Sequence, residues 1–331
     1  MPNFRTEIQL KRNDFKINHN HQLITIGSCF ADNIGKYFFD YKFKTLINPF
    51  GVLYNPISIL KSFELIIENK ELIESDLVFH NEQWHSFDHH GSFSSTNKEE
   101  CLQTINQSLN EAHLFLKNTD IIFITFGSAY VYEYKTNEQI VSNCHKIPEK
   151  NFRQYLLDLQ IIIKSWTILI EQLKEINPNL KIIFTVSPIR YLKYGSELNQ
   201  LSKSLLIIAV HQLIARFDNT EYFPAYEIMN DDLRDYRFYS EDMIHPNKIA
   251  IDYIWNKISE TYFDNQTSKI LGEIKKLNQA KNHRPINVNS QAHQAFLKNQ
   301  IEQLESIKKI YPNIDLSDEL SYFSKIFIGY S

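Results

Sequence analysis

A serine near the start of the chain stands between an expected strand and an expected helix. The apolar run Leu23–Ile26 is followed by Gly27, Ser28 and Cys29, and a helical pattern begins directly after them. A serine at such a turn presents its hydroxyl near a helix N-terminus, where backbone N–H groups and the helix dipole stabilise a developing oxyanion. A serine before a helix is also a common N-cap. Ser28 therefore needs a nearby base before a nucleophilic role is favoured.

Asp242 and His245, in the stretch YSEDMIHPN, are the candidate base and its orienting carboxylate. Their three-residue spacing can place both side chains on the same side of a turn, so that the carboxylate reaches one imidazole nitrogen and the other faces a serine. The same spacing also allows Asp242 to accept only local backbone N–H bonds, with His245 merely preceding a helix that begins near Pro246. Combined with Ser28, the pair completes a Ser-His-Asp set.

The elements that must position these residues follow an alternating pattern of strands and helices. Short runs rich in Ile, Val, Phe and Thr alternate with segments of helical period, which is typical of a parallel sheet with crossover helices. The expected strands are Leu23–Ile26, Thr45–Ile47, Ile121–Phe126, Lys181–Val186 and Tyr222–Tyr226. The expected helices are Pro56–Asn69, Lys98–Asn118, Arg153–Ile176 and Ser196–Phe217. Since ligands lie at the carboxyl ends of parallel strands, the residues that follow each strand are the ones to inspect.

Composition predicts one large α/β core with appended helices. The chain has 331 residues, of which 43% are hydrophobic, and its formal net charge of -4 shows no basic excess that would favour nucleic acid. We predict a catalytic domain over residues 1–263 and a helical C-terminal extension over residues 264–331, packed on the same domain. No membrane partner is expected, because no stretch approaches the roughly 18 apolar residues of a membrane span. Composition does not predict the oligomeric state.

Cysteine usage and the N-terminal residues point to a reducing compartment. Cys29, Cys101 and Cys144 are odd in number, far apart, and without a CxxC pair, so neither a disulfide framework nor a thiolate zinc site is indicated. The first residues also lack the apolar core of a signal peptide. We predict a cytoplasmic protein with no metal or organic cofactor, and we expect the Cys29 side chain to point into the core.

Two long aromatic and polar loops, residues 48–56 and 81–95, are candidate binding loops. The second carries a cluster suited to stacking on a sugar ring and hydrogen-bonding its hydroxyls, although a histidine-rich loop can also hold a metal or serve structure alone. Arg190, in a separate loop, suits an ester or carboxylate oxygen, or pairs with an acidic side chain across the site. His145, in another loop, suits polarising a substrate, or serves the structure of its loop. The candidate substrate contacts are Trp84, His85, Asp88, His89, His145 and Arg190, with His90 in the same cluster.

The longer motifs resemble the GSCFA family, which is similar to the SGNH, or GDSL-like, hydrolases. The motifs that carry the resemblance are GSCFA at residues 27–31, NPFGVLYNP at residues 48–56, TFGSAYVYE at residues 125–133, NCHK at residues 143–146, TVSPIR at residues 185–190, the segment ending in DMIHPN, and HRP in the tail. The resemblance extends over about residues 20–310. It implies a doubly wound, flavodoxin-like α/β fold, with a parallel sheet flanked by helices and a helical extension at the C-terminus.

The resemblance also implies roles for particular residues. Ser28 takes the place of the nucleophile after the first strand, and Asp242 and His245 take the places of the Asp and His of a DxxH motif. The oxyanion hole is matched by the backbone of Ser28, by Gly51 and by Gly127. The motif after the third expected strand reads GSAY, residues 127–130, where the family pattern has an asparagine. We therefore infer that Asn143, from a neighbouring loop, supplies the missing side-chain donor.

These observations favour a serine hydrolase that cleaves O-acyl esters, with acetyl on a carbohydrate or glycan as the expected substrate. The same triad also suits an O-acyltransferase, because an acyl-enzyme does not specify which hydroxyl accepts the acyl group. A third reading uses Cys29 as the nucleophile with His145 or His245. A fourth is a sugar-binding module that retains the pocket but lacks a working oxyanion hole.

Overall fold

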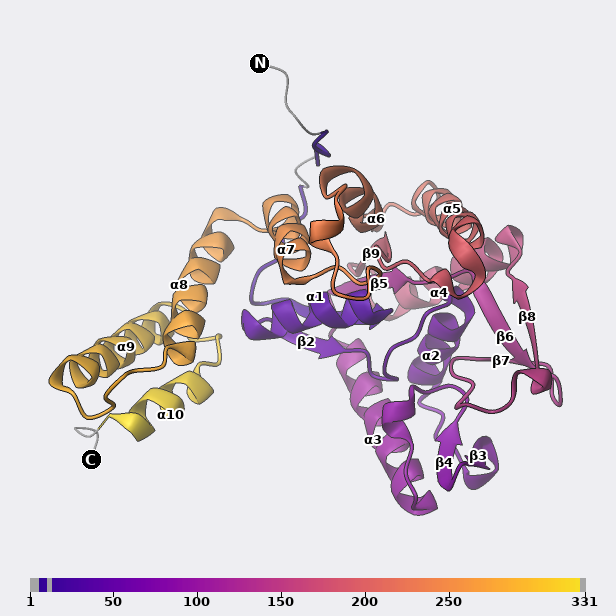
Figure 1. The fold of residues 1–331 in the computed structure, drawn as a ribbon, viewed down its shortest axis with the longest axis horizontal. Coiled ribbons are helices and arrows are strands. Elements are labelled where there is room, and N and C mark those ends of the chain that lie inside the picture. The colour runs from indigo at the N-terminus through magenta and orange to yellow at the C-terminus, as the bar shows by residue number, and fades with distance from the viewer. Residues whose placement is uncertain (1–5, 11–13, 328–331) are drawn as a thin grey trace. The chain divides into compact units, whose positions relative to one another are not determined.

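The apolar runs of the sequence form a five-stranded sheet in the larger of two compact units. The computed structural model describes residues 6–10 and 14–327; residues 1–5, 11–13 and 328–331, which fall within the two predicted domains, lie outside the described residues. The strands follow the order β10-β9-β5-β1-β2. Figure 1 labels β2, β5 and β9 of this sheet. Their bounds are β1 Gln22–Gly27, β2 Lys44–Ile47, β5 Ile121–Phe126, β9 Lys181–Val186 and β10 Thr220–Tyr222.

The order of the strands gives the sheet a switch point beside the predicted nucleophile. Parallel pairing joins β1 to β5, β5 to β9 and β9 to β10, with Gly27 opposite Thr125 at the end of the first ladder. Beginning from β2, the strands follow the 2-1-3-4-5 order of a flavodoxin-like sheet, so the predicted doubly wound fold is confirmed. Such sheets bind ligands where the winding reverses, which here is between the carboxyl ends of β1 and β5.

Helices cover both faces of the sheet. On one face, alternate strand residues such as Ile24 and Phe126 share a core cluster with the apolar sides of α2, α3, α4 and α5. On the other face, Gly35 of α1 lies against the Thr25 side chain. An asparagine N-cap begins α2, because Asn55 Oδ1 accepts the Ser58 N–H at 2.8 Å and Pro56 follows the cap. The helix bounds are α1 Cys29–Asp40, α2 Pro56–Glu68, α3 Lys98–Leu116, α4 Leu159–Ile176, α5 Gly195–Ile214, α6 Ala225–Glu227 and α7 Lys248–Tyr262.

Two small antiparallel sheets are inserted between the main elements. The hairpin β3–β4 turns through Asn81 and Glu82, which both have positive φ. The three-stranded sheet has the order β7-β6-β8 and follows β5 in the chain. The bounds are β3 Leu77–His80, β4 Gln83–Ser86, β6 Tyr130–Tyr134, β7 Gln139–Val141 and β8 Phe152–Leu156.

Two of the expected elements are wrong in part. The helix expected over Arg153–Ile176 begins only at Leu159, because residues 152–156 pair with β6 as strand β8. The strand expected over Tyr222–Tyr226 ends at Tyr222, and the short helix α6 begins at Ala225. In both places the local pattern was compatible with either structure, and long-range pairing selected one.

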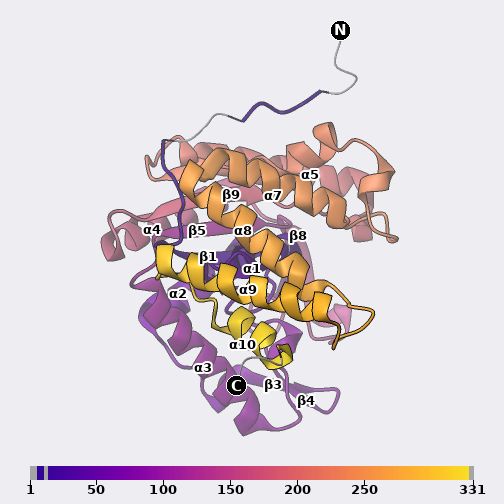
Figure 2. The ribbon, with the colours of Figure 1, turned by 90° about the vertical axis from the view of Figure 1, so that its left-hand side faces the viewer.

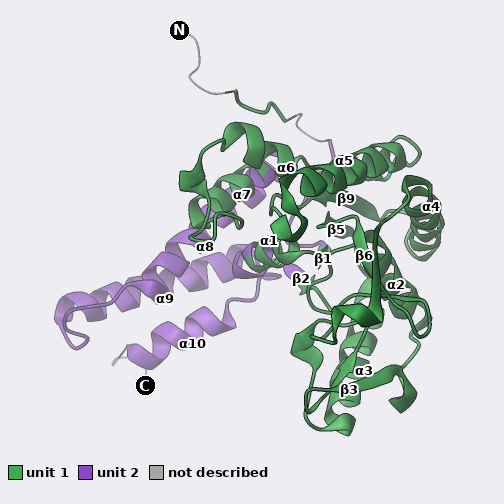
Figure 3. Cartoon of the chain, turned by 45° about the vertical axis from the view of Figure 1, so that its right-hand side comes forward, with its two compact units in different colours: residues 1–10, 22–36, 45–257 green, residues 11–21, 37–44, 258–331 purple. Residues whose placement is uncertain are grey.

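The chain divides into two compact units, residues 1–10, 22–36 and 45–257, and residues 11–21, 37–44 and 258–331 (Figure 3). The second unit contains three successive helices, α8 Asn265–Asn282, α9 Gln291–Ile310 and α10 Ser317–Ile326 (Figure 2), so the predicted C-terminal helices are confirmed. Their buried faces share a core that includes Leu277, Leu304 and Phe323. Within the described ranges, no helix combines the length and the apolar character that crossing a membrane requires.

Candidate active site

The turn between β1 and α1 holds Ser28 in a tightly packed position. Gly27 has a φ of 134°, and a Cβ at this position would stand 2.1 Å from the carbonyl oxygen of Thr125, so the turn requires glycine. The Gly27 N–H donates to Asn48 Oδ1 at 2.9 Å, which links β1 to the loop after β2. Ser28 is 1% exposed, and its hydroxyl accepts the N–H of Phe30 at 3.3 Å, as an N-cap does.

Asp242 and His245 form the hydrogen-bonded pair that their spacing predicts. Asp242 Oδ2 lies 2.6 Å from His245 Nδ1, and Asp242 Oδ1 accepts the backbone N–H groups of Ile244 and His245 at 2.9 Å each. These backbone donors, followed by the His245 side chain, lower the pKa of the Asp242 carboxyl to about 2. An ionised carboxylate only accepts, so His245 Nδ1 carries the hydrogen and Nε2 is left to act as a base.

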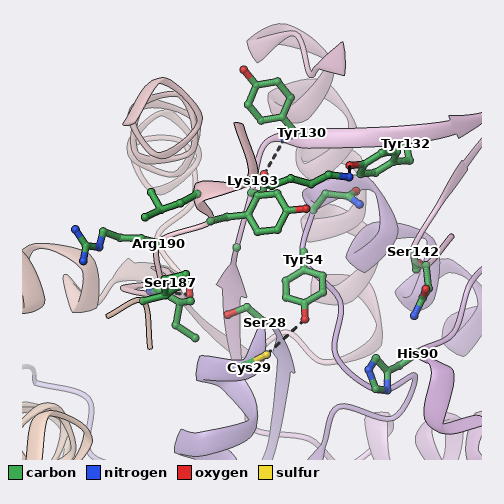
Figure 4. Close-up of a pocket in the computed structure, with 18 of the residues that line it drawn as sticks. Ser28, Cys29, Tyr54, His90, Tyr130, Tyr132, Ser142, Ser187, Arg190 and Lys193 are labelled. Carbon is green, nitrogen blue, oxygen red and sulfur yellow. Dashed lines mark hydrogen bonds between the residues drawn. The ribbon is translucent and has the colours of Figure 1, made fainter. Parts of the chain in front are cut away.

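Ser28 and His245 line the same cavity, although they lie in distant parts of the chain. The cavity has a volume of 660 Å³ and lies at the carboxyl ends of the strands, where Gly127 and Ser187 also line it. Figure 4 shows Ser28 and Cys29 together at one side, with the hydroxyl of Tyr54 directed at the Cys29 sulfur. The nucleophile predicted from one strand end and the base predicted from a late loop thus line one cavity.

The predicted oxyanion donors differ in whether they are available. Ser28, Gly127 and Asn143 line the cavity, whereas Gly51 does not. The Gly51 N–H donates to the Asn48 carbonyl at 2.7 Å, and the Gly127 N–H donates to the Tyr54 carbonyl at 2.8 Å.

Asn143 and Ser28 are the donors that remain easiest to recruit. The Ser28 N–H donates to Thr125 over a longer distance of 3.2 Å. Asn143 Oδ1 accepts the His145 N–H at 2.9 Å, and its Nδ2 has no hydrogen-bond partner within the part of the chain that the structure describes. Among the predicted donors, the Asn143 amide thus has no partner within the described residues, and the Ser28 N–H makes the longest of the three backbone bonds.

Comparison with known proteins identifies the family. Residues 22–258 match the GSCFA family, and residues 274–327 match a second family, described as GSCFA domain protein, C-terminal domain. The chain belongs to the GSCFA family. The resemblance read from the motifs is thereby confirmed. No curated protein matches the chain.

Two solved structures are similar to parts of this GSCFA chain. One is a carbohydrate esterase family 3 protein from Talaromyces cellulolyticus, with 16% identity, a TM-score of 0.27, and coverage of 49% of this chain and 62% of that one. The other is an acetyl xylan esterase from the rumen bacterium Butyrivibrio proteoclasticus, with 11% identity, a TM-score of 0.35, and coverage of 74% and 66%. The chain spans less than two thirds of the length of each of these structures.

The histidines predicted as substrate contacts in the GSCFA chain bond to and stack on other groups of the protein. His90 lines the cavity, but His85, His89 and His145 do not. His85 bonds to Ser94 Oγ and the His80 carbonyl, at 2.6 and 2.9 Å, and stacks on His145 with ring centroids 4.4 Å apart.

Burial keeps two of these imidazoles neutral. His89 is 1% exposed and stacks on Phe50 at 4.3 Å, and burial lowers its pKa to about 3. His145 donates from Nε2 to the Ser86 carbonyl at 2.7 Å, and burial lowers its pKa to about 4. Neutral, stacked rings of this kind stabilise the loop, and neither faces the Ser28 cavity.

Trp84 and Asp88 also lie outside the cavity lining. Trp84 lies in strand β4, where the ammonium group of Lys98 stands 4.7 Å from the centre of its ring. Asp88 pairs with Lys61 at 2.7 Å. Among the described residues, no group of three or more His, Cys, Asp or Glu side chains is arranged to hold a metal ion.

Arg190 lines the cavity but uses its guanidinium on the protein itself. One Nη donates to the Met243 carbonyl at 2.5 Å, and the guanidinium carbon lies 4.6 Å from the centre of the Tyr239 ring. Met243 stands between the two residues of the acid–base pair and has a φ of 59°. Arg190 therefore holds the turn that carries Asp242 and His245.

Cys29 does not point into the core, and that expectation is wrong. Its side chain lines the cavity, and its Sγ lies 3.5 Å from the Tyr54 hydroxyl. Cys29 is the first residue of α1 and directly follows Ser28 at the carboxyl end of β1, where the cavity lies. The residue that follows Ser28 is thus part of the cavity lining.

The tyrosines of the cavity wall were missed in the sequence. Tyr54, Tyr130, Tyr132 and Tyr191 all line the cavity, together with Lys193. Lys193 Nζ bonds to Glu149 at 2.6 Å and to the Tyr132 hydroxyl at 3.0 Å, and burial raises the pKa of Tyr191 to about 12. The alternation of tyrosines in YVYEY, residues 130–134, was the available signal, because residues two apart in a strand share a face.

Proposed function

We propose that this GSCFA chain is a serine hydrolase of the SGNH type that cleaves O-acyl esters, with a small acyl group such as acetyl on a carbohydrate or glycan. The observation that carries the proposal is that Ser28 and the Asp242-paired His245 open into one cavity. A serine at a strand end and a carboxylate-paired imidazole in a late loop are the residue types from which an activated nucleophile is built.

The reaction uses the three residues in a fixed order. His245 Nε2 takes the proton from the Ser28 hydroxyl as the oxygen attacks the ester carbonyl, and the ionised Asp242 stabilises the imidazolium that forms. The intermediate collapses to acyl-Ser28 while His245 protonates the departing alcohol. Water then attacks the acyl group with His245 again as the base, which releases the carboxylic acid and restores the serine.

The oxyanion is held by donors that the structure leaves near the cavity. Asn143 Nδ2 supplies a side-chain donor, and the Ser28 N–H joins it when its 3.2 Å bond to Thr125 gives way. Each such donor contributes about 3 to 4 kcal/mol to the barrier reduction. Asn143→Ala is therefore expected to lower kcat by about 100-fold or more.

The cavity wall suits an acyl group carried on a ring-shaped alcohol. Its 660 Å³ falls within the usual range for small-molecule sites, about 300 to 1,000 Å³. Aromatic rings such as those of Tyr54, Tyr130 and Tyr132 offer flat apolar faces with hydroxyl groups at their edges. These features match a sugar better than they match a strongly charged substrate.

A second candidate has Cys29 as the nucleophile, since its side chain lines the same cavity beside Ser28. The two candidates make opposite predictions for two single substitutions. If Ser28 is the nucleophile, Ser28→Ala abolishes turnover and Cys29→Ala retains it. If Cys29 is the nucleophile, Cys29→Ala and iodoacetamide abolish turnover and Ser28→Ala retains it.

The test is hydrolysis of p-nitrophenyl acetate and of an O-acetylated oligosaccharide by wild type and by both variants, with and without EDTA. Asp242→Asn should lower kcat by about 10,000-fold, because the amide favours the wrong imidazole tautomer. Turnover that survives Ser28→Ala overturns the serine mechanism. Oligosaccharide binding without turnover by wild type would instead indicate a binding module.

A further inference from the structure

Lys203 of α5 is a buried lysine that the proposed mechanism does not use. It is 1% exposed, although lysine side chains are rarely buried without a partner. Its Nζ donates to the carbonyl of Gly127 and to the carbonyl of Ser187, at 2.7 Å each. No carboxylate of the described residues pairs with it, and the centre of the Tyr226 ring lies 5.9 Å away.

The two carbonyls that Lys203 joins are those that follow β5 and β9. Gly127 and Ser187 both line the Ser28 cavity. Gly127 packs directly on the nucleophile, because a Cβ added to it would lie 3.2 Å from the Ser28 Cβ. A single buried amine therefore ties together two neighbouring strand ends, one of which contacts Ser28.

The residue before Lys203 holds the same loop. Ser202 Oγ accepts the N–H of Ala129 at 2.8 Å, so two successive residues of α5 bond to residues 127–129. On the other side of the loop, the Tyr54 carbonyl accepts the N–H groups of Gly127 and Ser128 at 2.8 and 2.9 Å. The segment beside the nucleophile is thus bonded from two directions.

The chemistry of the amine fits two acceptors. Burial lowers the pKa of Lys203 to about 7, so that the neutral amine is well populated at neutral pH. A neutral amine has two N–H groups, and the structure supplies two carbonyls for them. An apolar side chain of the same length would leave both carbonyls without a donor, which costs free energy in a buried position.

We propose that Lys203 is a positioning residue for Ser28: its amine joins the Gly127 and Ser187 carbonyls and thereby fixes the loop on which the nucleophile packs. This inference rests on the proposed function, because it assigns Lys203 a part in the Ser28 reaction. Lys203 acts through the loop and does not touch the substrate. Its loss is expected to slow the chemical step more than it weakens substrate binding.

The experiment compares wild type, Lys203→Met, Lys203→Ala and the control Lys257→Met. Lys257 is 9% exposed and bonds to Glu7 at 2.7 Å, but it is not part of the cavity lining. Turnover of p-nitrophenyl acetate is divided by the number of sites that a fluorophosphonate labels, so that unfolded protein is not counted. Lys203→Met should lower kcat per labelled site by about 10- to 100-fold, as a displacement of about 1 Å does, with KM changed less than about threefold. Lys257→Met should match wild type.

Chemical rescue separates positioning from a general loss of packing. n-Propylamine has the three carbons and the nitrogen that Lys203→Ala removes, and n-propanol has the same length with one donor. The amine should raise the turnover rate of Lys203→Ala at least about fivefold more than n-propanol does, because only the amine has donors for both carbonyls. The rate that Ser28→Ala shows with the same amine is subtracted first. Hydrogen exchange of residues 127–131 should rise in Lys203→Met and not in Lys257→Met.

The role of Lys203 is overturned if Lys203→Met keeps its kcat per labelled site, or if amine and alcohol rescue Lys203→Ala equally. The proposed function still stands in that case, provided that the wild type turns over the ester. Absence of turnover and of fluorophosphonate labelling in wild type refutes the proposed function, and with it the catalytic importance of Lys203. The two failures are therefore distinguishable.

Discussion

Gly27→Ala tests the packing that places Ser28 at the end of β1. A methyl group here would lie 2.1 Å from the Thr125 carbonyl oxygen, and the backbone φ of 134° is rarely adopted by a residue with a side chain. The same carbonyl accepts the Ser28 N–H. The substitution therefore strains the backbone and pushes β1 away from β5 beside Ser28.

The expected size follows from the two contributions. Holding alanine at this φ costs about 1 to 3 kcal/mol, and the steric overlap adds about 1 to 3 kcal/mol. Gly27→Ala should thus lower the free energy of unfolding by about 2 to 6 kcal/mol, a large part of the roughly 5 to 15 kcal/mol of a typical domain. Relief of the overlap also needs the strand ends to separate by about 1 Å, which predicts a loss of about 100-fold in kcat.

Urea unfolding followed by tryptophan fluorescence measures the first quantity, because Trp166 is fully buried in the core beside Phe126 and Phe184. Gly91→Ala is the matched control, since a methyl there would come no closer than 3.9 Å, to the Asn143 side chain. The control should keep both stability and activity. If Gly27→Ala unfolded at the same urea concentration as wild type and kept its turnover, the tight approach of β1 to β5 would be refuted.

Three further substitutions test contacts of Arg190, Gly127 and His89. Arg190→Met removes a hydrogen bond from a charged group to the Met243 carbonyl, worth about 1.5 to 3 kcal/mol, and should lower kcat at least about tenfold. Steady-state kinetics in which only KM rises would show that Arg190 binds substrate instead. Gly127→Ala places a methyl 3.2 Å from the Ser28 Cβ, so turnover should be lost while the free energy of unfolding falls by no more than about 1 to 3 kcal/mol. A variant that is inactive because it is strongly destabilised would contradict this. His89 has a pKa of about 3 against a usual 6.5, so below pH 6.5 the unfolded chain binds a proton that the folded chain does not, and the free energy of unfolding falls as the pH is lowered to about 3. In urea titrations, His89→Asn should remove about 2 kcal/mol of the fall in the free energy of unfolding between pH 7 and pH 5, and an equal pH dependence in both proteins would refute the buried neutral imidazole.

Much of the fold could be predicted because it depends on local patterns. The apolar runs that became β1, β5 and β9 are short, rich in branched residues, and bounded by polar segments, so their positions agree with the structure to within a residue. Strand β8 was missed because the letters FRQYL, residues 152–156, have no strong period of their own. Pairing with β6 made them a strand, and that pairing depends on residues far along the chain.

The pairing of Asp242 with His245 could be predicted from the sequence, because a separation of three residues can bring the two side chains together on one turn. The position of Ser28 was determined in the same local way, by a strand end and a helix start. Only the tertiary structure decided that these groups share a cavity, that the tyrosines wall it, and that His85, His89 and His145 are packed elsewhere. Only the tertiary structure also decided the contacts of Lys203, which lies in α5 and bonds to two carbonyls that follow β5 and β9. The physical reason is range: hydrogen bonds within a turn are set by chain geometry, whereas membership of a cavity is set by how distant segments pack.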